Sequence, residues 1–212
     1  TSWHENGQKK EEGNHKDNER HGKWTFWFNN GKKYKESNYK DGKLVGVTYY
    51  QHYENYQIYI EENYKDTEND GTFLQKREDG SYLELHGRQT SWHKNGQIES
   101  EENYINGKKD GKSTGWHENG QIFYEEYYID GEKDGKHTTW MEDGQLREES
   151  TYKNGETIYS HRFSYYENGQ KSFERSYNHL MQSDGKTTKW YENGQIKEVK
   201  NYKDGDHVGK WT

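Results

Sequence analysis

The stretch "WYENGQIKEVKNYKDG" runs from Trp190 to Gly205, and related versions of it occur eight more times in the 212-residue chain. The glycine of the first Asn-Gly or Asp-Gly pair after the tryptophan position marks each copy. Successive markers are 24 or 25 residues apart, except for one interval of 16, and they fall at Gly7, Gly31, Gly80, Gly96, Gly120, Gly144, Gly169 and Gly194, with Tyr56 in one place. A fixed period of this length indicates a repeat architecture over the whole chain.

Each copy predicts a β-hairpin. Asn-Gly or Asp-Gly occurs 17 times and supplies 17 of the 23 glycines. Such pairs favour a type I′ turn, in which both central residues have positive φ. The flanking segments alternate Tyr, Trp, Thr, Ile or Val with Lys or Glu, in the period of two that is typical of strands. Strict alternation places Ile196 and Tyr202 on one face of the strand and Val199 on the other.

The composition predicts an ordered chain with little interior. Apolar residues make up 25% of the chain and charged residues 33%, a balance that by itself is typical of disorder. However, 16% of the residues are aromatic and there is no proline, which disordered segments usually contain. Because each aromatic side chain can bury roughly 150–250 Å², we expect the aromatic residues to provide most of the buried area.

Charge and cysteine content exclude several classes of function. The net charge is −7 with both signs interspersed, which disfavours nucleic acid and anionic membrane lipid as partners because both need a concentrated basic surface. The chain contains no cysteine. Disulfides, thiolate metal sites and cysteine nucleophiles are therefore excluded. Exported and cytoplasmic proteins can both lack thiols. The absence of thiols slightly favours an exported or cell-surface protein over a cytoplasmic one.

Three segments resemble the MORN repeat in its bacterial variant form: "GKWTFWFNNGKKY" (Gly22 to Tyr34), "YKDGKLVG" (Tyr39 to Gly46) and "GKSTGWHENGQIFYEEYYIDGEKDG" (Gly111 to Gly135). The resemblance implies an all-β fold, an elongated single-layer antiparallel β-sheet of about nine tandem hairpin repeats. It also implies scaffolding or binding in place of catalysis. Bacterial proteins of this kind are often the antitoxin of a toxin–antitoxin pair, which would make the partner a toxin.

The repeat pattern is broken in the middle of the chain. Tyr56 replaces a turn glycine, and the copy around Gly80 lacks its tryptophan and part of its second turn. We therefore expect one repeat array over residues 1–212, with an irregular or shortened segment at about 56–91. The chain also ends on "GKWT", which opens an earlier repeat, and neither end resembles a capping repeat. This pattern predicts either a longer native array or edge-to-edge association into a homo-oligomer.

Aromatic residues at fixed positions form the candidate binding site. A tryptophan precedes the turn glycine by four residues, and a tyrosine follows it by eight. We expect this aromatic ladder to bind a partner, although the same residues also have to form the core. Its members are Trp3, Trp27, Trp92, Trp116, Trp140, Trp190, Tyr104, Tyr128, Tyr152 and Tyr202. The turns themselves are predicted at Gly7, Gly31, Gly96, Gly120, Gly144, Gly169 and Gly194.

Other candidate sites are weaker. His4, His93 and His117 follow the repeat tryptophan, but they lie roughly 10 Å per repeat apart, too far for a shared metal ion, so we interpret them as surface residues. The aspartates of the Asp-Gly turns are explained by turn chemistry without calcium. No pair of carboxylates differs from its counterparts in other repeats, and no catalytic motif is present. We therefore predict no enzyme activity, no metal and no cofactor.

The leading function hypothesis is a scaffold that binds a protein partner through its aromatic face or its free sheet edges. The alternative is a module that binds cell-wall glycan or choline, because choline-binding repeats are also aromatic hairpins. A third hypothesis, membrane-lipid binding, is weakened by the net charge of −7.

Overall fold

The computed structural model describes residues 1–55, 57–67, 74–76 and 82–209. These residues form strands and turns and contain no helix, so the predicted all-β fold class is confirmed. Accordingly, no described segment is a helix that is long and apolar enough to cross a membrane. The chain divides into two compact units, unit 1 (Thr1–Gly111) and unit 2 (Lys112–Thr212), and each is considered by itself.

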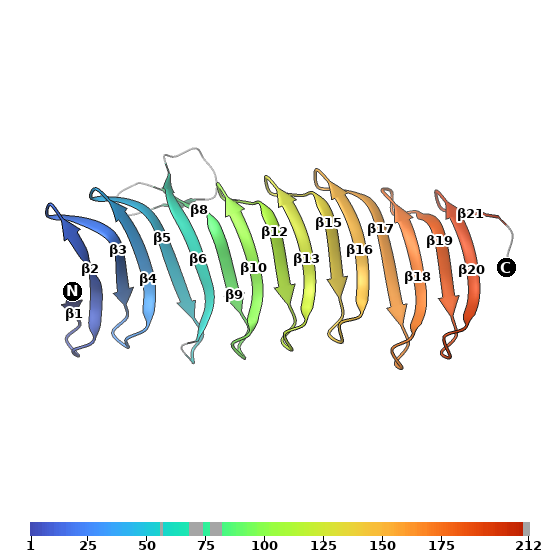
Figure 1. The fold of residues 1–212 in the computed structure, drawn as a ribbon, viewed down its shortest axis with the longest axis horizontal. Coiled ribbons are helices and arrows are strands. Elements are labelled where there is room, and N and C mark those ends of the chain that lie inside the picture. Colours follow the sequence, from blue (N-terminus) through green and yellow to red (C-terminus); the bar gives the residue numbers. More distant parts are fainter. Residues whose placement is uncertain (56, 68–73, 77–81, 210–212) are drawn as a thin grey trace. The chain divides into compact units, whose positions relative to one another are not determined.

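Unit 1 is a single-layer antiparallel sheet in which consecutive strands up to β6 are hydrogen-bonded neighbours (Figure 1). Its described strands are β1 (Ser2–Trp3), β2 (Lys9–Lys16), β3 (Glu19–Trp27), β4 (Lys33–Lys40), β5 (Lys43–His52), β6 (Ile58–Thr67), β7 (Leu74–Lys76), β8 (Tyr82–Leu85), β9 (Gly87–Trp92), β10 (Ile98–Ile105) and β11 (Lys108–Lys109).

Unit 2 repeats the same meander of curved antiparallel strands (Figure 1). Its strands are β12 (Gly111–Trp116, beginning at the unit boundary), β13 (Ile122–Ile129), β14 (Glu132–Lys133), β15 (Gly135–Trp140), β16 (Leu146–Lys153), β17 (Glu156–Tyr165), β18 (Lys171–Asn178), β19 (Ser183–Trp190), β20 (Ile196–Lys203) and β21 (Asp206–Val208).

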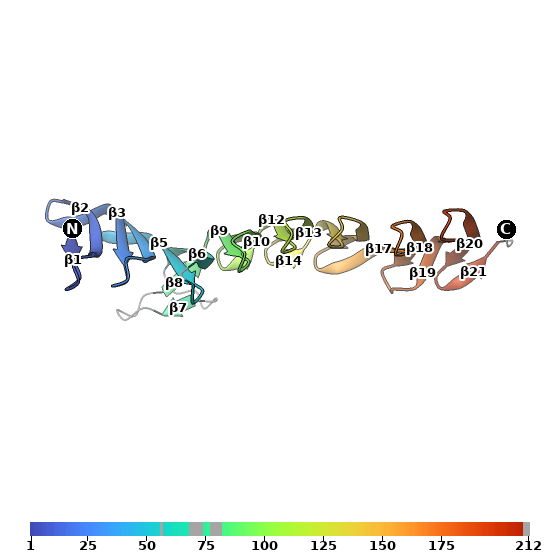
Figure 2. The ribbon, with the colours of Figure 1, turned by 90° about the horizontal axis from the view of Figure 1, so that it is seen from below.

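The segment at about 56–91, which was expected to be irregular, contains a strand that pairs with two other strands on the same side. Strand β6 pairs with β9 along its first half and with β8 along its second half. The Gln89 side chain bridges the junction, where it accepts a hydrogen bond from the Asn63 N–H at 2.6 Å and donates one to the Asn63 carbonyl at 2.9 Å. Strand β7 lies beside β8 (Figure 2). Residues 56, 68–73 and 77–81, which include Tyr56 and Gly80, lie outside the described residues.

The turns fall into two classes, and the type I′ prediction holds for only one of them. In most second turns both central residues have positive φ, as in Asp130 (55°) and Gly131 (88°); the turn at Asn178–Gln182 is an exception, in which only Met181 (57°) has positive φ. In the first turn only the glycine does: Gly120 has φ 83°, and its N–H donates to the His117 carbonyl at 2.9 Å. The first turn is therefore a type I turn followed by a glycine bulge. All seven predicted turn glycines have φ between 80° and 86°.

The asparagine of the first turn has a different role from the one expected. Its side-chain oxygen accepts the N–H two residues later: Asn119 Oδ1 accepts from Gln121 at 2.9 Å, and Asn168 Oδ1 accepts from Gln170 at 3.0 Å. Asn and Asp are favoured here because they form this local hydrogen bond. Tolerance of positive φ is not required at this position.

Neighbouring first turns are joined by the residue that follows the repeat tryptophan. His4 Nε2 lies 2.8 Å from the Trp27 carbonyl oxygen, and His117 Nε2 lies 3.1 Å from that of Trp140. A tyrosine makes the equivalent bond elsewhere, as Tyr166 does to the Trp190 carbonyl at 2.6 Å. The interpretation of His4 and His117 as surface histidines was therefore wrong, because both are half-buried inter-repeat contacts.

The two units differ in their interiors. In unit 1, Leu44, Val47 and Tyr64 form a buried cluster, and Trp24 is also buried. In unit 2 the buried side chains are small hydroxyls with one aromatic ring, namely Ser113, Thr114, Thr138, Ser150, Ser160, Phe163, Ser176, Thr187 and Thr188. The described part of unit 2 therefore buries less apolar surface in its interior than unit 1 does.

His117→Ala is expected to lower the free energy of unfolding of unit 2 by about 0.5–1.5 kcal/mol, the net contribution of one hydrogen bond. The substitution removes the bond to the Trp140 carbonyl and the ring contact with Phe123 at 4.8 Å. Urea unfolding measures the change. His179→Ala is the control, because His179 is exposed. Equal stability of the two variants would show that the inter-repeat bond contributes nothing.

Candidate functional site

The predicted aromatic ladder lies on two opposite faces of each unit. In unit 2, Trp140 lies on the same face of β15 as Thr138, which pairs with Glu149. Tyr152 pairs with Gly135 and contacts the His137 ring at 5.8 Å on the other side. We call the two sides the tryptophan face (Trp3, Trp27 and Trp92 in unit 1; Trp116, Trp140 and Trp190 in unit 2) and the tyrosine face (Tyr104 in unit 1; Tyr128, Tyr152 and Tyr202 in unit 2).

A one-residue bulge after each first turn causes this separation. Thr139 pairs with Glu148 and Trp140 pairs with Leu146, so Arg147 has no partner in the ladder. An extra residue reverses the alternation of side chains between faces. The prediction for Ile196 was wrong for the same reason. Ile196 pairs with Trp190 on the tryptophan face, whereas Tyr202 lies on the tyrosine face.

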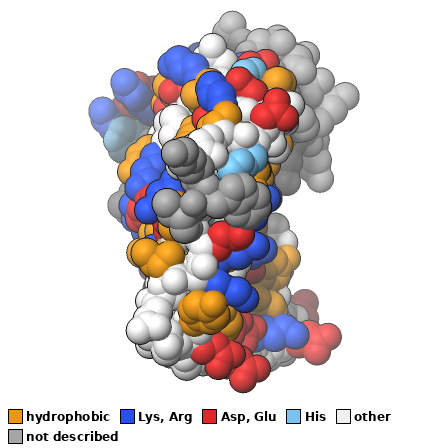
Figure 3. Space-filling view, turned by 90° about the vertical axis from the view of Figure 1, so that its right-hand side faces the viewer, with side chains coloured by type: hydrophobic (Ala, Val, Ile, Leu, Met, Phe, Trp, Pro, Cys, Tyr) orange, Lys and Arg blue, Asp and Glu red, His pale blue; other side chains and the backbone are white. Residues whose placement is uncertain are grey.

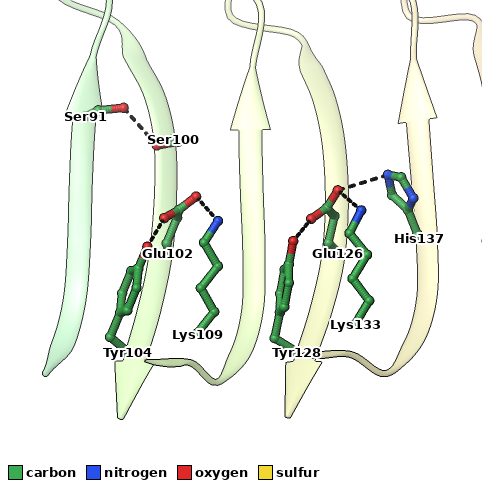
Figure 4. A network of polar contacts seen from close by, with 9 residues as sticks. All are labelled: Ser91, Ser100, Glu102, Tyr104, Lys109, Glu126, Tyr128, Lys133 and His137. Atoms are coloured by element: carbon green, nitrogen blue, oxygen red, sulfur yellow. Dashed lines mark hydrogen bonds and ion pairs between the residues drawn. The ribbon is translucent and has the colours of Figure 1, made fainter. Parts of the chain in front are cut away.

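The tyrosine face carries internal polar networks (Figure 4). In unit 1, the Glu102 carboxylate accepts hydrogen bonds from the Tyr104 hydroxyl at 2.7 Å and from Lys109 Nζ at 2.6 Å. In unit 2, the Glu126 carboxylate accepts from the Tyr128 hydroxyl and, at 2.8 Å, from Lys133 Nζ. The hydroxyls of Tyr104 and Tyr128 are thus already used within the protein, which makes them poor contacts for a partner.

His137 completes the unit 2 network, with its Nε2 3.1 Å from Glu126 Oε1 (Figure 4). Burial lowers the pKa of His137, and the nearby Lys133 ammonium lowers it further, against the opposing effect of Glu126 and Glu148. Burial alone would raise the pKa of Glu126, but the hydrogen bonds from Lys133 and Tyr128 outweigh it and lower that pKa. The network is therefore stable as a carboxylate beside a neutral imidazole.

The stability of unit 2 is expected to fall as the pH drops below about 6.5, the ordinary pKa of histidine. A folded-state pKa below that of the unfolded chain means that the unfolded chain binds more protons in this window, so unfolding is favoured as pH falls. The lowered pKa values of His137 and His161 both act in this direction. Urea midpoints between about pH 8 and about pH 5 measure the slope. His137→Gln should make the slope shallower; an unchanged slope would contradict this assignment.

The tryptophan face of unit 2 contains an open recess around Trp140. Its volume is about 410 Å³, and its walls are formed by Glu125, Tyr127, Lys136, Thr138, Trp140, Leu146 and Glu149. Tyr127 is 43% exposed, and the nearby Tyr159 on β17 is 40% exposed. Cross-strand ion pairs, Lys112 with Glu125 and Lys136 with Glu149, border the aromatic surface. The recess thus combines accessible aromatic rings with a charged rim.

A second recess, of about 530 Å³, lies in unit 1 between two neighbouring first turns. It is lined by the rings of Phe28, Tyr50, His52, Tyr53 and Tyr59, none of which belongs to the predicted ladder. The sequence did contain a signal for it. Phe28 occupies a position where most other repeats carry histidine or tyrosine and one carries Met141, and His52 occupies a tryptophan position.

Neither recess has a cluster of metal-binding side chains among its described lining residues. The described residues contain no group of three or more His, Asp or Glu side chains that could hold a metal ion. On the surface drawn in Figure 3, basic and acidic side chains are interspersed, with hydrophobic ones between them. The unit 1 recess is lined by Lys32 and Glu54, and the unit 2 recess by Lys136, Glu125 and Glu149. Because each lining carries charges of both signs, both recesses suit binding by shape and ring contact better than binding by a field of one sign.

The family model described as "MORN repeat variant" matches seven segments of the chain, at residues 1–17, 20–41, 85–106, 109–130, 133–154, 161–179 and 183–204. These segments cover more than half of the chain. The chain belongs to the MORN repeat variant family. MORN repeats are a non-catalytic repeat fold that serves as a general module of protein or membrane interaction. No curated protein matches the chain.

The MORN matches leave residues 42–84 uncovered. This interval contains β5 and β6, which form one wall of the unit 1 recess, whereas Phe28 on the opposite wall belongs to a matched repeat. The unit 2 recess, by contrast, lies entirely within matched MORN repeats. The two recesses therefore differ in origin: one is a feature of the regular repeat, and the other arises where the repeat pattern changes.

Proposed function

We propose that this chain is a non-enzymatic scaffold that binds a protein partner through the tryptophan face of unit 2. The observation that carries the proposal is the recess at Trp140, where Tyr127 is substantially exposed beside paired charges. Aromatic side chains in a recess with a polar rim are the usual anatomy of a protein interface. The tyrosine face of unit 2 is a weaker candidate, because the Tyr128 hydroxyl is bonded internally to Glu126.

The rim favours a protein over a membrane surface as the partner. Lys136 and Glu149 form a cross-strand ion pair beside Trp140, and Lys112 and Glu125 form another. Because each lysine is matched by a carboxylate, the rim presents no net positive field to anionic lipid. A protein surface with charges of both signs can pair with such a rim, and this arrangement gives specificity more than affinity.

An affinity capture experiment with matched variants tests the proposal. Wild-type protein, Tyr127→Ala and Tyr202→Ala are immobilised and exposed to lysate and envelope fractions of the source cells. Tyr202 lies on the tyrosine face of the same unit and serves as the control. We expect one protein to be captured by wild type and by Tyr202→Ala, and its affinity to fall roughly tenfold or more with Tyr127→Ala. Capture that is insensitive to Tyr127→Ala would reject the tryptophan face as the contact surface.

An antitoxin role is a more specific form of this proposal, in which the partner is a toxin. It is supported only by the resemblance to bacterial MORN-variant proteins, an argument from family analogy. The captured partner allows a direct test. If it is a toxin, producing it alone should arrest growth, and co-producing this chain should restore growth. Restoration should be lost with Tyr127→Ala and retained with Tyr202→Ala.

A further inference from the structure

We propose that the unit 1 recess binds a saccharide, with a pyranose ring stacked against Phe28. The recess lies between the turn at residues 28–32, which precedes β4, and the segment before β6 that is closed by the hydrogen bond from the Tyr53 N–H to the Gln57 carbonyl. It shares no residue with the recess at Trp140. The inference therefore goes beyond the proposed scaffold function and does not depend on it.

The recess exists because one inter-repeat contact is missing. At the preceding turn the His4 imidazole bonds to the Trp27 carbonyl, and at the following turn the Tyr53 hydroxyl donates to the Trp92 carbonyl at 2.9 Å. Phe28 occupies the same position but has no donor to offer, as is also true of Met141 in unit 2. In addition, His52 stands where most other repeats carry the larger tryptophan. Both replacements leave space between turns that are joined elsewhere.

The walls of the recess include tyrosine rings whose hydroxyls form hydrogen bonds to other groups of the chain. Tyr50 donates its hydroxyl to Glu36 at 3.2 Å, Tyr53 donates to the Trp92 carbonyl, and Tyr59 donates to the Gln51 side chain. Phe28 is 45% exposed and is supported from behind by the Tyr34 ring, with centroids 4.6 Å apart. Pre-positioned, partly exposed rings offer a flat apolar surface at little cost in side-chain entropy.

Polar groups with unused donors or acceptors surround these rings. Asn29, Asn30, Lys32 and Glu54 line the recess. Asn30 uses its side-chain oxygen to accept the Lys32 backbone N–H at 3.0 Å, which leaves its amide N–H groups for a ligand. Among the described residues, no ion pair engages Lys32 Nζ or the Glu54 carboxylate. The recess therefore offers both donors and acceptors at its rim.

This combination fits a neutral polyhydroxyl ligand better than an ionic one. One lysine and one glutamate balance each other, and burial and the Lys32 charge lower the pKa of His52, which keeps the imidazole neutral near pH 7. A saccharide presents C–H groups with partial positive charge on one face, which suits the negative face of an aromatic ring. Its hydroxyls can both donate and accept, as the amide and charged side chains at the rim require. The volume of about 530 Å³ lies within the usual range for small-ligand sites.

Ligand-observed NMR with soluble oligosaccharides tests the inference. Chitotetraose, cellotetraose, maltotetraose and mannotetraose are each added to the full chain, and a short tyrosine-rich peptide is included as the competing class of ligand. We expect saturation transfer to the C–H protons of at least one oligosaccharide. We also expect its affinity to fall about tenfold or more in Phe28→Ala, which removes the stacking surface.

Two further variants separate binding from stability. Phe28→His introduces the residue found at His4 and His117; it should preserve or raise stability and still weaken saccharide binding, because the imidazole turns toward the next turn. His117→Ala removes an inter-repeat bond in unit 2 and should leave saccharide binding unchanged. The inference is overturned if no oligosaccharide binds, if binding is equal in Phe28→Ala, or if only the tyrosine-rich peptide binds at this recess. None of these results bears on the Tyr127 surface, so the two proposals fail separately.

Discussion

Replacing Trp24 with alanine is expected to lower the free energy of unfolding of unit 1 by about 3–5 kcal/mol, the usual cost of truncating a buried tryptophan. Trp24 is 3% exposed, and among the described buried apolar residues only Val47, at 2%, is less exposed. Its indole N–H donates to the Asn14 carbonyl at 3.1 Å, and the Arg20 guanidinium lies 4.2 Å from the ring centroid. The substitution therefore removes apolar burial, a hydrogen bond and a cation–π contact together.

The backbone opposite Trp24 is shaped for the indole. A Cβ atom at Gly13 would overlap the Trp24 ring, so glycine is the only residue that leaves room for it. At Ser37, the position equivalent to Gly13, the partner on the following strand is Val47, which is smaller than tryptophan. Urea unfolding of Trp24→Ala and of Trp3→Ala measures the effect. Trp3 is 60% exposed and should change stability by less than about 0.5 kcal/mol. Similar losses for both variants would contradict a burial-driven core in unit 1.

Gly115→Val is expected to destabilise unit 2 by about 1–3 kcal/mol or more, the range for overpacking a filled site. The Tyr124 ring lies directly over Gly115, so any Cβ there would overlap the ring. The next repeat provides a natural comparison: Thr139 takes the place of Gly115, and Glu148 takes the place of Tyr124. A threonine is thus accommodated at this position where no ring lies opposite, whereas opposite the Phe173 ring the equivalent residue is the smaller Ser164.

A double-mutant cycle tests this explanation. Combining Gly115→Val with Tyr124→Ala removes the overlap, so the double variant should be more stable than the sum of the two single effects predicts. Thermal unfolding of all four proteins gives the coupling free energy. Additive effects would show that Gly115 is needed for some reason other than space for Tyr124.

The repeat, the strands and the positions of the turns could be predicted because they depend on local chemistry. Asn-Gly and Asp-Gly restrict the backbone directly, and alternation of aromatic and charged residues sets the strands. The identity of the faces could not be predicted by counting. A single bulged residue such as Arg147 reverses the alternation, and nothing in its side chain distinguishes a bulge from a paired position. For this reason Trp140 and Tyr152 were placed in one ladder, although they lie on opposite faces.

The unit 1 recess was not predicted from the sequence either, for a different reason. The break in the pattern at Tyr56 was recognised from the sequence, whereas the replacements at Phe28 and His52 were not, because both keep an aromatic or imidazole ring. The effect of these two replacements becomes clear only from the hydrogen bonds of His4 and Tyr53, whose side chains join neighbouring first turns from the position that Phe28 occupies. In a repeat protein, the residue that lacks a contact made by its counterparts is a useful signal of a site.

The central claim is that unit 2 contacts a protein through its tryptophan face. Site-specific photo-crosslinking in the source cells tests this most directly, with a photoreactive phenylalanine analogue placed at Tyr127 or at Tyr202. Tyr127 lines the recess at Trp140, whereas Tyr202 lies on the opposite face. We expect light-dependent attachment of one protein from position 127 and none from position 202. Crosslinking from position 202 alone, equal crosslinking from both positions, or none from either would contradict the account.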